Sequence, residues 1–117
     1  MDDRTLEMTM LFDFFGDLLT EKQREYFDLY HNEDLSLSEI GAGAGITRQG
    51  VYDIITRAER TLIETERKTG IIRRWSEMQT QIEAAAAAAN ELARILPSGE
   101  MAELANKLVS ILSELKG

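Results

Sequence analysis

Apolar side chains recur along this chain at intervals of three and four residues, which is the spacing of one face of an α-helix. The first such run covers residues 3–19, and its apolar face is formed by Leu6, Met10, Leu11, Phe14, Phe15, Leu18 and Leu19. Polar breaks separate it from further runs at about residues 21–31, 36–43, 48–69, 71–96 and 101–115. The pattern therefore predicts an all-α fold.

The predicted helix starts carry side chains that can accept hydrogen bonds from the first helical turn. Thr20 is followed three residues later by Gln23, and Ser36 by Glu39, which is the spacing of a capping box in both cases. Thr47 stands where it can cap a third helix. These residues set the expected starts of three helices within residues 20–70.

Residues 37–56 fit the template of a helix-turn-helix motif. Gly41 stands where the two helices of the motif cross most closely, and Gly45 stands in the turn, where φ is positive. Apolar residues are expected to seal the corner, with Ala44 filling the tight position before the turn; the sealing residues are Ile40, Ile46, Val51 and Ile54. A helical corner with a purely structural role is the alternative interpretation.

The second helix of this motif predicts a nucleic-acid-binding face. Its apolar positions are used for packing, which leaves outward Thr47, Arg48, Gln49, Tyr52, Asp53, Thr56 and Arg57, with Arg60 and Lys68 further along. Arg48 and Gln49 can present forked donors to guanine or adenine edges in a major groove. Thr47 and the backbone N–H groups beside it can hold a phosphate. Asp53 repels phosphate, so it either reads a cytosine amino group or argues against deep insertion.

Residues 71–117 have the spacing of coiled-coil seams. The first seam comprises Ile71, Trp75, Met78, Ile82, Ala85, Ala89, Leu92 and Leu96, and the second Met101, Leu104, Leu108, Ile111 and Leu115. Pro97-Ser98-Gly99 separates them, and Ser98 can cap the second helix. We therefore expect a helix-turn-helix domain over residues 1–70 and an antiparallel helical hairpin over residues 71–117.

The hairpin is expected to act as a dimerisation arm. Its alanines make the seam shallow, so a lone hairpin would leave apolar surface exposed. Pairing two hairpins into a four-helix arrangement would cover both seams and predicts a homodimer. The alternative is that the hairpin folds back on the Phe12–Phe15 helix of its own chain.

The net charge of −8 is unevenly distributed along the chain. Residues 1–35 carry ten acidic and three basic side chains. Residues 36–75 carry five acidic and seven basic side chains, and residues 76–117 carry six acidic and three basic side chains. Any contact with a polyanion is therefore expected within residues 36–75, whose net charge is only +2. Solvated helix faces explain the same distribution without any nucleic acid.

The composition gives no support for an enzyme. The chain has no cysteine, which excludes disulfides, thiolate catalysis and Cys-ligated zinc. Its single histidine, His31, is expected to be a surface or helix-end residue rather than a ligand. No GxGxxG, P-loop or GxSxG motif occurs. We expect no catalytic residue, no metal and no cofactor.

A cytoplasmic location is expected. The longest stretch without a charge, residues 40–47, is far shorter than the ~20 residues of a spanning helix, so no membrane insertion is expected. The first residues, Met1-Asp2-Asp3-Arg4, lack the basic region of a signal peptide.

Four stretches of the sequence carry a family resemblance: residues 10–16 (MLFDFFG), 19–23 (LTEKQ), 30–40 (YHNEDLSLSEI) and 47–53 (TRQGVYD). They resemble the YlxM family of small bacterial helix-turn-helix proteins, also called p13-like, over about residues 5–75. That family is similar to the promoter-reading region 4 of sigma factors, and it is encoded beside the GTPase of the signal recognition particle. The sequence departs from the family pattern at Gly41-Ala42-Gly43, and residues 76–117 have no counterpart in it.

The resemblance implies an all-helical fold, no catalysis, and a regulatory or particle-associated role. The DNA-reading positions of the sigma-like domain map onto Thr47, Arg48, Gln49, Tyr52 and Asp53. Two functions compete on this basis. The chain is expected to bind DNA or the particle RNA, or else to dock on the particle GTPase through its acidic N-terminal region or its hairpin.

Overall fold

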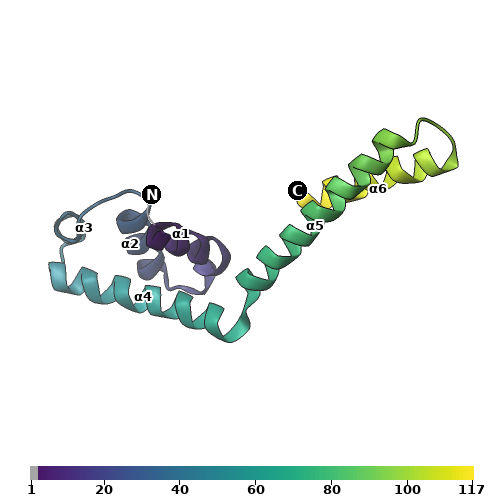
Figure 1. Cartoon of the computed structure of the whole chain (residues 1–117). Helices are drawn as coiled ribbons and strands as arrows, with labels where there is room; N and C mark the ends of the chain where they lie inside the picture. Colours follow the sequence, from purple (N-terminus) through teal and green to yellow (C-terminus); the bar gives the residue numbers. More distant parts are fainter. Residues whose placement is uncertain (1–2) are drawn as a thin grey trace. The chain divides into compact units, whose positions relative to one another are not determined.

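The computed structural model describes residues 3–117, and all regular structure within this range is helical (Figure 1). The described helices are α1 (Asp3–Phe15), the 3-10 helix η1 (Gly16–Leu18), α2 (Glu21–His31), α3 (Leu37–Ala44), α4 (Arg48–Thr69), α5 (Ile71–Ile95) and α6 (Glu100–Lys116). The predicted all-α fold is confirmed for these residues. Met1 and Asp2, on which part of the signal-peptide argument rests, lie outside the described residues. The chain divides into two units, Met1–Ile72 and Arg73–Gly117.

Helix α4 is the centre of the first unit, since α1, α2 and α3 all pack against it. It buries Val51, Ile55, Ala58 and Leu62, at intervals of four, three and four residues. The N-terminal pair joins a cluster with Tyr26 and Ile40, which α2 and α3 supply.

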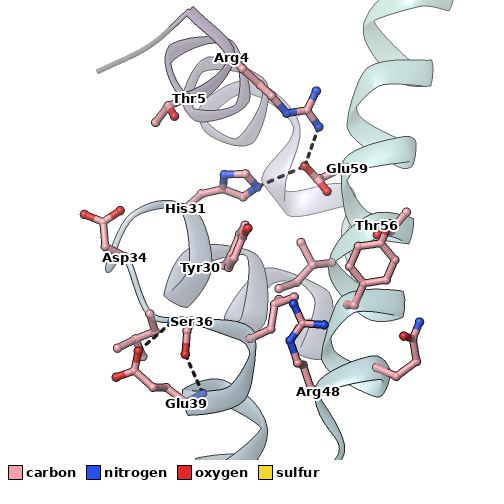
Figure 2. Close-up of a pocket in the computed structure, with 15 residues that line it drawn as sticks. Arg4, Thr5, Tyr30, His31, Asp34, Ser36, Glu39, Arg48, Thr56 and Glu59 are labelled. Atoms are coloured by element: carbon pink, nitrogen blue, oxygen red, sulfur yellow. Dashed lines mark hydrogen bonds and ion pairs between the residues drawn. The ribbon is translucent and has the colours of Figure 1, made fainter.

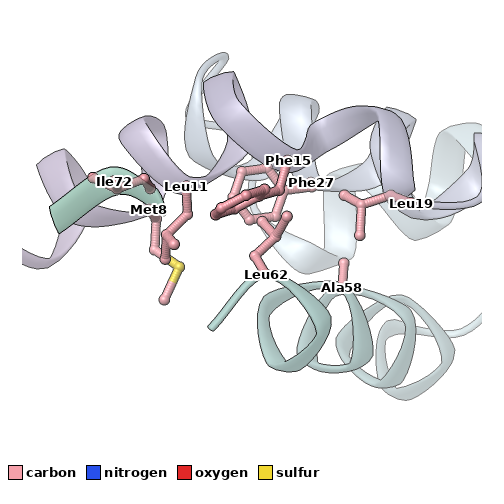
Figure 3. Packing of buried hydrophobic residues seen from close by; sticks show 8 residues of the cluster. All are labelled: Met8, Leu11, Phe15, Leu19, Phe27, Ala58, Leu62 and Ile72. Carbon is pink, nitrogen blue, oxygen red and sulfur yellow. The ribbon is translucent and has the colours of Figure 1, made fainter. Parts of the chain in front are cut away.

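The other buried pair of α4 joins a second cluster at the far end of the helix. There Ala58 and Leu62 reach from α4 toward α1 and α2 (Figure 3). The remaining members of this cluster are Met8, Leu11, Phe15, Leu19, Phe27 and Ile72. Ile72 comes from the first turn of α5, so this turn contributes to the core of the first unit.

The first helix ends earlier than its apolar spacing predicts. It stops at Phe15 and tightens into η1, which is closed by the N–H of Leu19 bonding to the carbonyl of Gly16 at 3.1 Å. The chain must become extended at Leu19 and Thr20 because Thr20 caps the next helix. The buried face of α1 also includes Met8, while Leu6, Phe14 and Leu18 are exposed, which corrects the predicted face.

The predicted helix caps at Thr20, Ser36 and Thr47 are confirmed. Thr20 Oγ1 accepts from the N–H of Gln23, whose side chain accepts from the N–H of Thr20. Ser36 and Glu39 form the same reciprocal pair, with both distances 3.0 Å. Thr47 Oγ1 accepts from the N–H of Gly50 at 3.0 Å. Caps depend on neighbouring residues only, so they can be predicted from the sequence.

The corner between α3 and α4 is built on two glycines. Gly45 has φ 74°, as expected for the turn residue. A Cβ on Gly41 would lie 2.7 Å from the carbonyl oxygen of Ile46, so the two helices meet with no room for a side chain. The prediction that Ala44 and Ile46 seal the corner is wrong, because both are exposed. Since the backbones meet at Gly41, these two side chains lie outside the contact.

Helices α5 and α6 form the predicted hairpin, and Ile82 and Ala89 of the first predicted seam lie between them, but the other side chains in this contact are not seam residues. The side chains between them are Ile82, Ala86 and Ala89 of α5 with Val109 and Leu112 of α6. Ala102 and Ala105 of α6 are also buried. Several residues of the first predicted seam and the whole second seam take no part in this contact, because they are exposed; those of the first seam are Ile71, Trp75, Met78, Ala85 and Leu92. Small side chains let the two backbones approach closely, so alanine takes the inner positions.

The start of α6 also differs from the sequence prediction. Its N-cap is Gly99, with φ 99° and no side-chain cap, and not Ser98. The positive φ of Gly99 brings the chain out of the turn directly into α6, so the hydroxyl of Ser98 lies one position too early.

Substitution of two glycines of α3 by alanine tests the close approach at the corner. Gly41→Ala should lower the free energy of unfolding by about 1–3 kcal/mol, because its Cβ meets backbone that cannot move aside. Gly43→Ala is the matched control, since a Cβ there meets nothing within 4 Å. It should raise stability by up to about 1 kcal/mol, because alanine favours helix over glycine. Urea denaturation followed by circular dichroism measures both values, and equal effects would contradict this account of the corner.

Candidate nucleic-acid interface

The N-terminal half of α4 projects from the corner with its polar side chains outward. Thr47, Arg48, Gln49 and Asp53 are exposed, and Tyr52 is 49% exposed although it is aromatic. Thr56 is half-buried, while Arg57 and Arg60 are exposed further along the helix. The burial of Val51, Ile55 and Ala58 on the opposite face fixes which way these side chains point.

Four of the predicted residues line one cleft, which we call the α4 cleft (Figure 2). Its volume is about 910 Å³, and α4 contributes Arg48, Gln49, Tyr52 and Thr56. The opposite wall comes from α1, the end of α2 and the start of α3, through residues that include Arg4, Tyr30, His31, Ser36 and Glu39. Thr47, Asp53, Arg57 and Arg60 do not line it. The predicted set is therefore split between the cleft and the open surface of α4.

Gln49 and Asp53 are coupled to each other on the surface of α4. Gln49 Nε2 donates a hydrogen bond to Asp53 Oδ1 at 3.0 Å, one helical turn away. A base that used the Gln49 amide as a donor would have to replace this bond. Asp53 thus occupies the Gln49 amide and places a negative charge one helical turn before Arg57.

Glu59 is held at one end of the cleft by two basic side chains. Its Oε2 lies 3.3 Å from Arg4 Nη2 and 3.3 Å from His31 Nε2 (Figure 2). The His31 side chain is only 10% exposed and lies against the rings of Phe27 and Tyr30. Its Nε2 faces Glu59 without good hydrogen-bond geometry, and the contact is an ion pair only when His31 is protonated. The expectation of a helix-end position for His31 is confirmed, but the side chain does not lie on the surface.

The His31 imidazole beside Glu59 holds the pKa of this carboxyl below its ordinary value, although burial acts in the opposite direction. The charge of Arg4 adds to the lowering. The sequence pattern does not predict this group, because Arg4, His31 and Glu59 come from three helices far apart in the chain. One signal was present: Glu59 directly follows the buried Ala58 on α4, and a carboxylate that borders a packed face needs a cationic partner.

Several known proteins are similar to this chain in sequence. Residues 2–96 match the family model UPF0122, described as "Putative helix-turn-helix protein, YlxM / p13 like". A UPF0122 protein of Shouchella clausii is 38% identical over 115 residues, which cover 98% of this chain and 99% of that protein. A relative from Halalkalibacterium halodurans is 43% identical over 104 residues, 84% of this chain and 95% of its own. A relative from Thermoanaerobacter sp. (strain X514) is 48% identical over 83 residues, 71% of each chain.

The chain belongs to the UPF0122 family. This confirms the resemblance to YlxM and p13-like proteins, and it agrees with the corner at Gly41 and Gly45. The family model matches through α5, and the Shouchella clausii relative aligns with 98% of the chain. The expectation that residues 76–117 have no counterpart in the family is therefore wrong. Among the described residues, no helix is long and apolar enough to cross a membrane.

The charge on Glu59 should contribute to stability above its ordinary pKa of 4.5 and be lost in acid. Because the folded state lowers this pKa, stability falls as the pH drops below about 4.5 and through the folded value. Glu59→Gln should cost about 1–3 kcal/mol at pH 7 and flatten the decline toward about pH 3. Urea denaturation at both pH values measures this.

Glu64→Gln is the control for the acid test. The pKa of Glu64 is also lowered, chiefly by its hydrogen bond to Arg67, but that pair is exposed. This variant should behave like the parent protein at pH 7 within about 0.5 kcal/mol. If Glu59→Gln declines in acid as steeply as the parent, the assignment of the acid sensitivity to Glu59 is wrong.

Proposed function

We propose that the chain is a non-catalytic, nucleic-acid-binding regulatory protein that takes part in the signal recognition particle pathway. The observation that carries the proposal is the corner itself. The backbones of α3 and α4 meet at Gly41, and Thr47 caps α4 as the helix leaves the turn with its first polar side chains outward. A helix in this position enters the major groove with its N-terminal residues in helix-turn-helix proteins.

The side chains of α4 suit separate parts of this task. Arg48 can contact a guanine edge through its planar guanidinium, and the exposed Tyr52 offers a ring for an unpaired RNA base. The N–H groups at the start of α4 favour a phosphate, as does the positive end of the helix dipole. Arg57 and Arg60 suit backbone contacts, which position a helix without reading sequence.

The charge of the first unit limits the affinity. About four bases, Arg48, Arg57, Arg60 and Lys68, are available for phosphates, so the log–log dependence of affinity on salt should have a slope of about −3 to −4. The carboxylates of Glu39 and Glu59 at the α4 cleft and of Asp53 beside it oppose a close polyanion. Binding is therefore expected to be weak and steeply dependent on salt.

Membership of the family supports a role in the particle pathway, with the particle RNA or a DNA operator as the ligand. The second candidate is docking on the particle GTPase without any nucleic acid. The ten acidic and three basic side chains of residues 1–35 favour it, because this surface suits a basic protein partner and repels a polyanion. Fluorescence anisotropy with duplex DNA, the particle RNA and the particle GTPase, side by side, separates these candidates.

Two arginine substitutions test the assignment of α4 as the nucleic-acid-binding helix. Arg48→Ala should reduce affinity most and change any sequence preference, since Arg48 lies at the N-terminal end of α4. Arg60→Ala should weaken binding to all sequences about equally, because it is assigned to phosphates. Filter binding at several salt concentrations measures both effects. If the double variant binds DNA and RNA as the parent does, α4 is not the binding helix.

Substitution of Asp53, whose carboxylate lies beside the proposed binding face, should raise the affinity for nucleic acid. Asp53→Asn removes a charge that repels phosphates and weakens the hold on the Gln49 amide. Affinity should rise about threefold to tenfold at low salt, with a smaller gain at high salt. Glu33→Gln, on an exposed residue after α2 that does not line the α4 cleft, is the control for net charge. An equal gain in both variants would show that Asp53 does not face the nucleic acid.

A further inference from the structure

The hairpin of α5 and α6 leaves its largest apolar side chains outside. In α6 the exposed fractions are 72% for Met101, 66% for Leu104, 42% for Leu108, 46% for Ile111 and 56% for Leu115. In α5, Leu92 is 50% exposed and Ile95 60%. A hairpin that buries alanines and exposes leucines has its more hydrophobic surface facing solvent, which favours a partner.

These exposed residues lie on one side of the hairpin. In α6, Met101, Leu104, Leu108 and Ile111 each precede by one residue an inward-facing position, namely Ala102, Ala105, Val109 and Leu112. In α5, Ala85, Ala88 and Leu92 have the same relation to Ala86, Ala89 and the half-buried Ala93. A shift of one residue turns the side chain by the same angle in both helices. Because the two helices run antiparallel, these shifts turn the side chains of both helices toward the same side of the hairpin. We call this side the outer face.

We propose that the outer face binds the outer face of a second copy of this chain, with α6 antiparallel to α6 of the partner copy. The two-fold axis then runs across the helices, between Val109 and Ser110. Leu108 lies opposite Ile111 of the second copy, and Leu104 opposite Leu115. The spacing of three and four residues along α6 is what two helices need to interlock side chains along their length.

The charges on α6 select this register. Lys107 and Glu114 are exposed on the edge of the apolar stripe that faces away from α5. In the proposed register, Lys107 of each copy lies across from Glu114 of the other, which gives two attractive pairs. A shift by one heptad would bring Lys107 against Lys107 and Glu100 against Glu114. A parallel arrangement would place Lys107 beside Leu112, with no charge to pair.

The sizes of the side chains on α5 support the same register independently. Since Ala86 and Ala89 pack near Val109 and Leu112 in the hairpin core, the proposed axis meets α5 near Ala88. Leu92 of one copy then fits over Ala85 of the other, a large side chain over a small one. The register shifted by one heptad would instead place Leu92 against Leu92. The charges on α6 and the side-chain volumes on α5 thus favour the same two-fold axis.

Sedimentation equilibrium of the full-length protein tests whether a second copy of the chain binds the outer face. We expect a dimer at tens of micromolar and a monomer for Leu108→Glu, which places two charges beside the axis. Circular dichroism should show that this variant keeps its helix content, because Leu108 is 42% exposed in the single chain. A monomeric parent protein would overturn the proposal. So would a Leu108→Glu variant that loses helix content, because the stripe would then be covered by its own chain.

Substitutions of Lys107 and Glu114 test the proposed register, and the chain also offers a control substitution. Lys107→Glu and Glu114→Lys should each weaken the dimer about twofold to thirtyfold, and the double variant should restore it. These changes move the net charge in opposite directions, so a general charge effect would strengthen one dimer and weaken the other. Glu103→Lys lies away from the outer face and should leave the dimer constant unchanged. Insensitivity to both single changes, or a double variant without rescue, would overturn the proposed register. None of these readouts depends on nucleic acid.

Discussion

One row of four side chains on α4 holds the first unit together. Val51 and Ile55 face α2 and α3, while Ala58 and Leu62 face α1, α2 and the first turn of α5. Because this row is fully enclosed, α4 cannot rotate about its axis without opening both clusters. The direction of Arg48, Gln49 and Tyr52 is therefore fixed by hydrophobic packing on the other side of the same helix. For the nucleic-acid contact that we propose, a rigid scaffold of this kind lowers the cost in conformational entropy.

The features that depend on neighbouring residues could be predicted from the sequence. The caps at Thr20, Ser36 and Thr47 and the left-handed turn at Gly45 are of this kind. The hairpin shows where this approach fails. Two stripes offset by one residue have the same spacing, so the period predicts a helix but not which stripe faces its neighbour. Side-chain volume decides that choice, because alanines allow the close approach that leucines prevent.

The candidate site shows the same division between local and long-range information. The outward residues of α4 were predicted from helix periodicity. All of them are exposed except Thr56, which is half-buried. The α4 cleft needed the relative placement of α1, α2 and α4, which no local pattern contains. His31 illustrates the difference: its position at the end of α2 is a local property, whereas its burial beside Glu59 depends on α4.

The burial of Ile72 affects how the first unit can be studied in isolation. Gly70, with φ 62°, ends α4, and the change of sequence pattern there suggests a boundary. Ile72, however, lies beyond that glycine and is only 9% exposed within the cluster of Met8, Leu11 and Leu62. A fragment that ended at Gly70 would leave these side chains in contact with water, and a fragment that ended within α5 after Ile72 would keep them covered. The useful cut for an autonomous helix-turn-helix fragment therefore lies inside a continuous helix and not at the glycine that precedes it.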